Sequence, residues 1–225
     1  MAIGASEGGR VGVGAVTAPD GVTRVRKPRV STKGEQTRGR LVAAARTLLG
    51  GDGTTPFTTR NVAALGGVTH GMCHYHFANR TDLVIAVIED VRAEWILPVE
   101  EAVDAPGGFA DRAERVIAFL GQSEGRELAR LFSSVHWIAV TDERVRTVWE
   151  AEYRRWRAAF VRLFQVLADE LGNGLDPRPL GDAVAAAADG LAAVKSLNAE
   201  VDGRAVVRTL VLGLATAAAH PSSPR

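Results

Sequence analysis

Over most of the chain, apolar residues recur at three- and four-residue spacing, and this period constrains the fold more than any other feature. Leu41, Val42, Ala45, Leu48 and Leu49 form the first such stripe. A stripe with this period lies on one face of an α-helix. Alternating, β-branched segments of the kind that form strands are absent from the sequence. We therefore predict an all-α fold.

Glycines, prolines and polar stretches divide this pattern into helices. The first predicted helix runs from Gln36 to the Gly50-Gly51-Asp52-Gly53 stretch. A fourth begins at Asn79 or Thr81 and ends or kinks near Pro98, because proline interrupts helical hydrogen bonding. Further helices are predicted at about 109–121, 124–140, 142–171, 178–198 and 203–219.

Two short helices with a tight turn between them lie between the first and the fourth. Thr58 or Thr59 can cap the second helix, and Thr69 can cap the third, which extends to about His76. Ala63 is small where the two helices must touch, and Gly67 permits the unusual backbone of the turn. Val68 would close the interface between them. This arrangement is a candidate helix-turn-helix, whose third helix is of a size to enter a DNA major groove.

Charge divides the chain in the same place. Residues 24–80 carry ten Lys or Arg against two acids, a net charge of +8, whereas residues 81–225 carry a net charge of −6. A basic front half favours binding to a polyanion, and an acidic back half indicates a different task. The Gly- and Ala-rich residues 1–33, with a basic end at 24–33, are predicted to be a disordered arm that either solubilises the chain or contacts DNA phosphates.

The sequence T-R-G-R-L-V-A-A-A-R-T-L-L, followed by F-T-T-R-N-V-A-A-L-G-G-V-T-H-G-M-C-H-Y-H-F-A-N-R-T-D-L, resembles the DNA-binding domain of TetR-type (TetR/AcrR) transcriptional repressors. The resemblance covers about residues 37–83. It departs from the family pattern at Met72, at Cys73 where leucine is usual, and at Arg80 where lysine is usual. The family's tyrosine falls at His74, and a tyrosine follows at Tyr75. In the family this tyrosine contacts a phosphate of the DNA backbone. Either His74 or Tyr75 is a candidate for that contact in this chain.

The helix-turn-helix register and the resemblance together give a set of predicted DNA contacts. Base or phosphate contacts are expected from the exposed face of the third helix, and phosphate contacts from the residues around it. The set is Thr58, Thr59, Arg60, Thr69, His70, Gly71, Met72, His74, Tyr75 and Arg80.

Three histidines and the only cysteine fall at positions 70–76, which raises a metal site as an alternative. His70 and His74 are four residues apart and could share an ion on a helix, with Cys73 or His76 as a further ligand. In the helix-turn-helix register, however, Cys73 faces inward against Val62 and Leu41 as a small apolar residue. We therefore assign no metal and no cofactor, and keep a metal-responsive regulator as the alternative function.

The back half carries an aromatic face on the predicted helix 142–171. Such a face is either plain core or the wall of a cavity, and the resemblance implies a helical cage for a small effector. Residues at its apolar positions, with neighbours on the two helices before it, form the predicted effector set: Phe119, His136, Trp137, Trp149, Tyr153 and Trp156.

The last two predicted helices are rich in alanine and other small residues, which let helices approach closely. They suit an interface of two helices per subunit, as the resemblance also implies, or they close the core of a single chain. A symmetric homodimer would read a palindromic double-stranded DNA operator with two recognition helices.

The sequence thus predicts an arm at 1–33, a DNA-binding domain at 34–80 and a ligand-binding and dimerisation domain at 81–225. One cysteine fits a reducing compartment, and no signal peptide or membrane span is visible, so we expect a cytoplasmic location. Paired carboxylates, phosphate-binding loops and nucleophile–base spacings are also missing, and no enzyme is predicted. The expected function is a ligand-responsive repressor, with an activator on the same fold as a further alternative.

Overall fold

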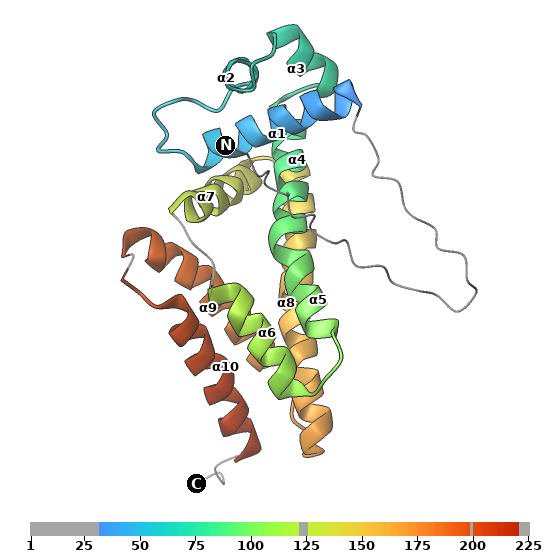
Figure 1. The fold of residues 1–225 in the computed structure, drawn as a ribbon, viewed down its shortest axis with the longest axis vertical. Coiled ribbons are helices and arrows are strands. Elements are labelled where there is room, and N and C mark those ends of the chain that lie inside the picture. Colours follow the sequence, from blue (N-terminus) through green and yellow to red (C-terminus); the bar gives the residue numbers. More distant parts are fainter. Residues whose placement is uncertain (1–31, 122–125, 199, 221–225) are drawn as a thin grey trace, which may run out of the picture.

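The computed structural model describes residues 32–121, 126–198 and 200–220, and every regular element in these ranges is a helix (Figure 1). The all-α prediction is therefore confirmed. In chain order the helices are α1 (Lys33–Gly50), α2 (Thr59–Leu65), α3 (His70–His76), α4 (Arg80–Val91), a π-helical turn (Arg92–Ile96), α5 (Leu97–Asp104), α6 (Phe109–Gly121), α7 (Arg126–Thr141), α8 (Glu143–Leu171), α9 (Pro177–Leu197) and α10 (Gly203–Ala219).

Helix α1 begins at Lys33, three residues before the predicted start. The Thr32 hydroxyl accepts a hydrogen bond from the backbone N–H of Glu35, and the Glu35 carboxylate accepts one from the backbone N–H of Thr32. This reciprocal capping box satisfies two N–H groups that a helix start otherwise leaves unpaired. The predicted arm lies outside the described residues except for its last two positions, 32 and 33.

The break predicted near Pro98 lies a few residues earlier. Helix α4 ends at Val91, the π-helical turn follows, and Pro98 lies in the first turn of α5. The Leu97 N–H donates to the Arg92 carbonyl across the π-helical turn, and Pro98, which has no N–H, interrupts the backbone hydrogen bonds one residue later. Helix α5 itself was not predicted. The irregularity is thus a π-helical segment within a continuous helical path.

Two apolar cores run along the molecule. The first joins α1–α4 to α7 and includes Leu41, Val62 and Leu131, each no more than 1% exposed. The second joins α5, α6, α8, α9 and α10 around Phe160 and Phe164. The long helix α8 runs beside α4 and α5 down the length of the molecule (Figure 1) and contributes to both cores.

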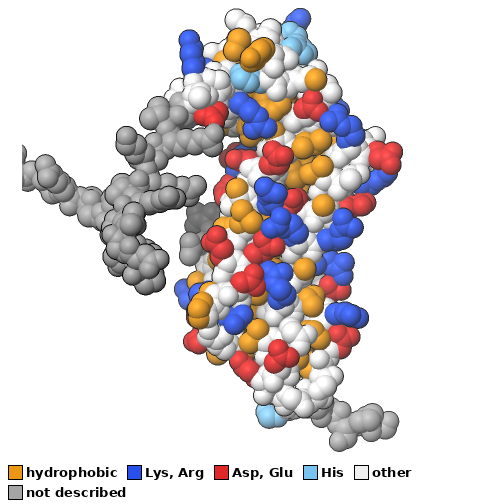
Figure 2. Space-filling model, turned by 90° about the vertical axis from the view of Figure 1, so that its right-hand side faces the viewer, with side chains coloured by type: hydrophobic (Ala, Val, Ile, Leu, Met, Phe, Trp, Pro, Cys, Tyr) orange, Lys and Arg blue, Asp and Glu red, His pale blue; other side chains and the backbone are white. Residues whose placement is uncertain are grey.

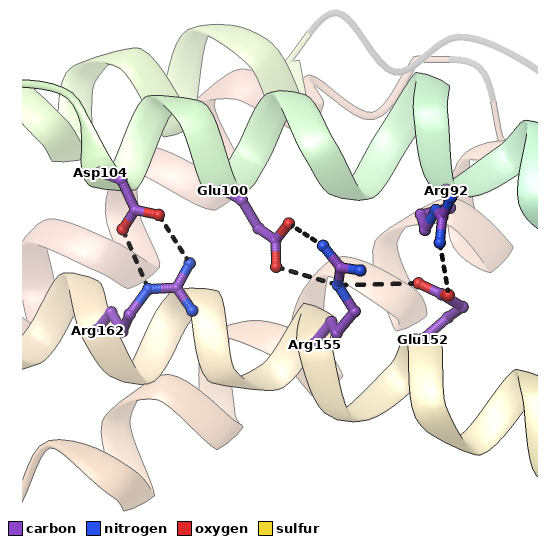
Figure 3. A network of polar contacts seen from close by, with 6 residues as sticks. All are labelled: Arg92, Glu100, Asp104, Glu152, Arg155 and Arg162. Carbon is purple, nitrogen blue, oxygen red and sulfur yellow. Dashed lines mark hydrogen bonds and ion pairs between the residues drawn. The ribbon is translucent and has the colours of Figure 1, made fainter.

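Ion pairs connect α8 to the π-helical turn and α5 along one side (Figure 3). Arg155 donates to both oxygens of Glu100, at 3.3 and 2.7 Å, and Arg162 donates to both oxygens of Asp104, at 3.1 and 3.2 Å. Paired donors of this kind fix geometry as well as charge. They hold α5 against α8 in a defined register. None of the described helices is both long and apolar enough to span a membrane.

Candidate functional site

The turn between α2 and α3 has the geometry that the sequence predicted. Gly67 adopts φ +65°, a conformation that side chains with a Cβ rarely adopt, and the Val68 N–H donates to the Ala63 carbonyl at 3.0 Å. Thr58 caps α2 by accepting from the Asn61 N–H, and Thr69 caps α3 by accepting from the Met72 N–H. The two helices are therefore held in a fixed relation.

The exposed face of α3 and its surroundings bring the predicted DNA contacts together at one end of the molecule. All of that set are exposed except Thr59, which is half-buried. Met72 is 40% exposed and Tyr75 is 79% exposed, with its ring against the edge of His76. Cys73 is fully buried in the first core, as predicted, and burial raises the pKa of its thiol.

Three side chains on this surface form a chain of polar contacts. The Nε2 atom of His70 lies 3.0 Å from Nε2 of His74 and 3.1 Å from Oγ1 of Thr59. The two imidazoles meet edge to face. The spacing of His70 and His74 indicated that they would be neighbours, but the contact with Thr59 joins α2 to α3 and could not be read from a helical period. Thr59 and His74 thus orient His70 on the outer surface.

Basic residues at this end fall into two groups. Arg46 is held by Asp90 and Glu94, and Arg38 lies 3.8 Å from Glu89. Lys33, Arg40, Arg60 and Arg80, by contrast, form no ion pair within the described residues; Arg80 lies over the ring of Phe57. Figure 2 shows histidine side chains near this end, while basic and acidic side chains alternate along the body. The second group remains available to phosphate oxygens.

The proposed metal ligands come together only in part: the Nε2 atoms of His70 and His74 lie 3.0 Å apart, but Cys73 does not join them. Cys73 points into the core, whereas His70 and His74 lie on the exposed face of α3. Across the described part of the chain, no group of three or more His, Cys, Asp or Glu side chains is arranged to hold a metal ion. Within the described residues, the metal alternative therefore has the His70–His74 pair but no third ligand.

A cavity of about 800 Å³ lies in the other half of the molecule, bounded by the end of α4, the π-helical turn, α7, α8 and α9. Its size is typical of a site for a small organic molecule. Its walls are mainly aromatic and apolar: Val91, Trp95, Ile96, Ala129, Phe132, Trp137, Trp149, Tyr153, Trp156, Ala192 and Ala193.

Five of the six residues predicted for an effector line this cavity: His136, Trp137, Trp149, Tyr153 and Trp156. Phe119 does not; its ring packs against Trp95, which forms part of the wall. The sequence reasoning missed Trp95, Glu152 and Asp189. Asp189 could have been found from the sequence, because it is an isolated acid in an alanine-rich helix. Acids are rare on a helix face that packs against other helices, so its presence there was a signal of a special role.

Polar atoms in the cavity wall lack partners. The indole N–H groups of Trp95 and Trp156 are buried and donate no hydrogen bond within the described residues, and Oε2 of Glu152 accepts none. Glu152 lies between Arg92, at 3.6 Å, and Arg155, at 4.0 Å (Figure 3). Buried polar groups without hydrogen bonds are costly, and in a cavity they mark positions that a ligand can satisfy.

Asp189 has an unusual environment at the edge of the cavity. Much of the residue is exposed, but the protein around its carboxyl group withdraws that group from water and raises its pKa to about 6. The nearby Tyr153 hydroxyl acts in the opposite direction and lowers the pKa. The pKa of Tyr153 is raised as well, by desolvation and by the nearby carboxylate. A desolvated acid in a cleft is a marker of a functional position.

Asp189→Asn is expected to raise the melting temperature by a few degrees at about pH 7.5, with little gain at about pH 4. Because the folded-state pKa lies above the ordinary value of 3.8, the folded wild-type chain takes up a proton as the pH falls from about 6 to 4, and it gains stability there. The variant lacks this titration. Tyr153 lies beside the Asp189 carboxyl group, and Arg157 and Asp182 lie near the Tyr153 hydroxyl; all three are present in both proteins. Thermal unfolding of both proteins at several pH values measures the difference, and a pH-independent difference would contradict the desolvation.

Within the described residues, the helix-turn-helix end and the aromatic cavity lie in different parts of an all-helical fold. No family model matches the sequence, and no curated protein matches it. Solved structures do match the fold. A candidate transcriptional regulator from Pseudomonas aeruginosa PAO1 superposes with a TM-score of 0.70 at 24% identity, covering 86% of this chain and 97% of that one.

Two further structures place the fold more narrowly. A candidate TetR-family transcriptional regulator from Rhodococcus sp. has a TM-score of 0.68 at 20% identity, covering 80% of this chain and 99% of that one. SmeT, the repressor of the Stenotrophomonas maltophilia multidrug efflux pump SmeDEF, has a TM-score of 0.63 at 19% identity in its triclosan complex, covering 81% and 90%. The chain therefore has the fold of the TetR-type transcriptional regulators, as the resemblance in its first helices predicted.

Proposed function

We propose that this protein is a DNA-binding transcriptional regulator whose operator affinity changes when a small effector binds, and that it acts as a repressor. The observation that carries the proposal is that α4 starts at Arg80, just after the end of α3, and leads through Val91 into the π-helical turn at the aromatic cavity. Among proteins of this fold, SmeT is a repressor and was solved with triclosan. That precedent supports a repressor that responds to a ligand.

The proposed DNA reader is α3. Its exposed face presents His70, Met72 and His74, while Thr58, Arg60 and Arg80 flank it. Imidazole nitrogens can donate to or accept from base edges, and a methionine side chain can touch a thymine methyl group. The flanking hydroxyl and guanidinium groups suit phosphate oxygens, which position a protein on DNA without selecting sequence.

Two helices would connect the cavity to the reader. Helix α4 starts at Arg80 beside α3, and Val91 at its other end lines the cavity. Helix α7 lines the cavity through Phe132, while its Ser134 hydroxyl donates to the Leu49 carbonyl of α1 at 2.8 Å. An effector that binds one arrangement of these helices more tightly than another would shift the population of DNA-competent molecules.

The regulator is proposed to be a homodimer formed through α9 and α10. Exposed apolar side chains on these helices include Val194, Leu197 and Val206, which are 43–86% exposed. Apolar surface of this kind marks a protein interface. A two-fold dimer would place two copies of α3 on a palindromic operator.

DNA selection tests this proposal. Full-length protein is mixed with fragments of the genome that encodes it, and bound fragments are sequenced and checked by gel shift at several salt concentrations. We expect a palindromic sequence whose binding weakens as salt rises. A reporter under the selected promoter then distinguishes repression from activation. Binding without sequence preference would overturn the proposal.

His70→Ala and Arg80→Ala are expected to affect operator binding differently. The His70 variant should change the preferred base at one position of each half-site, since a lost base contact is worth about 1–3 kcal/mol. The Arg80 variant should weaken all sequences about equally and reduce the salt slope by about one per subunit. Arg46→Ala is the matched control, because Asp90 and Glu94 already neutralise that guanidinium. Parallel selections on the three variants measure this, and equal losses from His70 and Arg80 would show that His70 does not read bases.

A further inference from the structure

The charged groups around the cavity are not balanced. Three carboxylates line it, those of Glu150, Glu152 and Asp189, against one guanidinium, that of Arg154. The negative charge of Glu152 is compensated within the protein, since Arg92 and Arg155 both lie within 4.0 Å of its carboxylate (Figure 3). Because Arg155 also pairs with Glu100, the two carboxylates and two guanidinium groups of this cluster sum to zero charge, and Glu152 offers no uncompensated carboxylate to a cation.

Asp189 has no such compensation. Its carboxyl group lies beside Tyr153, and it forms no ion pair within the described residues. It lies on α9, while Tyr153 lies on α8 and Trp137 lies on α7, so three helices meet around it at the cavity edge. Tyr153 and Trp137 are 39% and 70% exposed, which places this group at the cavity mouth.

The remaining walls suit a molecule that has an apolar body next to a positive charge. Trp95, Phe132, Trp149 and Trp156 form the inner surface, and Trp137 and Tyr153 the outer part. The faces of indole and phenol rings carry negative electrostatic potential and attract organic cations. The aromatic rings therefore favour the same sign of charge as the uncompensated carboxylate.

We propose that the effector is an organic cation with an apolar or aromatic body, whose positive head binds between Asp189, Tyr153 and Trp137 at the mouth while its body fills the aromatic interior. This rests on the proposed function for its regulatory meaning, but the binding itself does not depend on DNA. The bound cation would supply the charge partner that Asp189 lacks in the chain. The fold has already removed water from this carboxylate, at a cost in free energy. A cation that binds there therefore gains a stronger attraction, because little further water has to be removed from the carboxylate.

Three probes with one body and different heads test the proposal: 4-phenylbutylamine, 4-phenylbutanol and 4-phenylbutyrate. Binding to the full-length protein is measured by calorimetry and by tryptophan fluorescence at about pH 7.5, where the amine is protonated. We expect the ammonium to bind about tenfold more tightly than the alcohol, since a carboxylate contact and a cation–π contact together supply that much. The carboxylate should bind most weakly.

Asp189→Asn should remove the preference for the ammonium while leaving affinity for the alcohol within about twofold. Glu150→Gln is the matched control, because it deletes another exposed carboxylate of the same lining and should change the preference by less than about twofold. The melting temperature of each variant verifies folding independently of binding.

Other outcomes separate the two proposals. Equal binding of the ammonium and the alcohol, a preference that survives Asp189→Asn, or tightest binding of the carboxylate would overturn the cation assignment. In the last case the free indole N–H groups and Arg154 would be the head-group site. Failure of all three probes to bind, in protein that still selects an operator, would also overturn it and leave the regulator standing. Cation binding without operator selection would instead overturn the proposed function alone.

Discussion

Gly181→Ala is expected to lower the free energy of unfolding by about 1–3 kcal/mol or more. Helices α8 and α9 pack closely, and a Cβ at Gly181 would lie 2.5 Å from the backbone nitrogen of Val161 and 2.7 Å from its Cα. The obstacle is backbone, so no side-chain rotation relieves it. Alanine at this position therefore requires α8 and α9 to move apart, which loosens the second core around Phe160 and Phe164.

Gly39→Ala provides the matched control. Gly39 also lies inside a helix, but nothing lies within 4 Å of a Cβ built there. Because glycine is a poor helix former, this variant should gain up to about 1 kcal/mol. Urea unfolding of both variants, followed by circular dichroism, gives the comparison. If Gly181→Ala proved as stable as Gly39→Ala, the close approach of the two helices would be wrong.

The helical period and local cap chemistry account for what was predictable in the fold. Cys73 was placed inward by the helix-turn-helix register, and Gly67 was placed in the turn because glycine readily adopts the backbone conformation found there. Gly181 had no such signal. It lies near the start of α9, just after Pro177 and Pro179, and only the distance between two helices shows that the position must be small.

Contacts between distant helices explain what the sequence could not indicate. A period identifies the buried face of a helix but not the partner of each side chain. The pairing of Arg155 with Glu100 spans 55 residues, and the hydrogen bond from Ser134 to Leu49 spans 85. For the same reason, the aromatic face of α8 suggested a cavity wall, while Trp95 and Asp189 on the opposing elements were missed.

Gly213→Arg is expected to produce a monomer that binds a palindromic operator much more weakly. Gly213 lies on the exposed face of α10, and no atom of its own chain lies within 4 Å of a Cβ built there. Arginine therefore fits the single chain, and as a better helix former it favours α10. In the proposed dimer the same position faces the partner across small side chains such as Thr209 and Ala217, where a guanidinium has neither room nor a counter-ion.

The variant should weaken dimerisation at least a hundredfold, because a buried unpaired charge costs several kcal/mol. Operator affinity should then fall by about 10²–10⁴, since each subunit binds a half-site without the advantage of linkage. Analytical ultracentrifugation and gel shifts measure the two effects, and circular dichroism verifies that helix content is kept. Ala110→Arg, on the exposed first turn of α6, adds the same charge elsewhere and should leave both unchanged. If the Gly213→Arg protein remained dimeric at micromolar concentration, the subunit interface would not be formed by α10. The proposed spacing of the two reading helices would then be wrong as well.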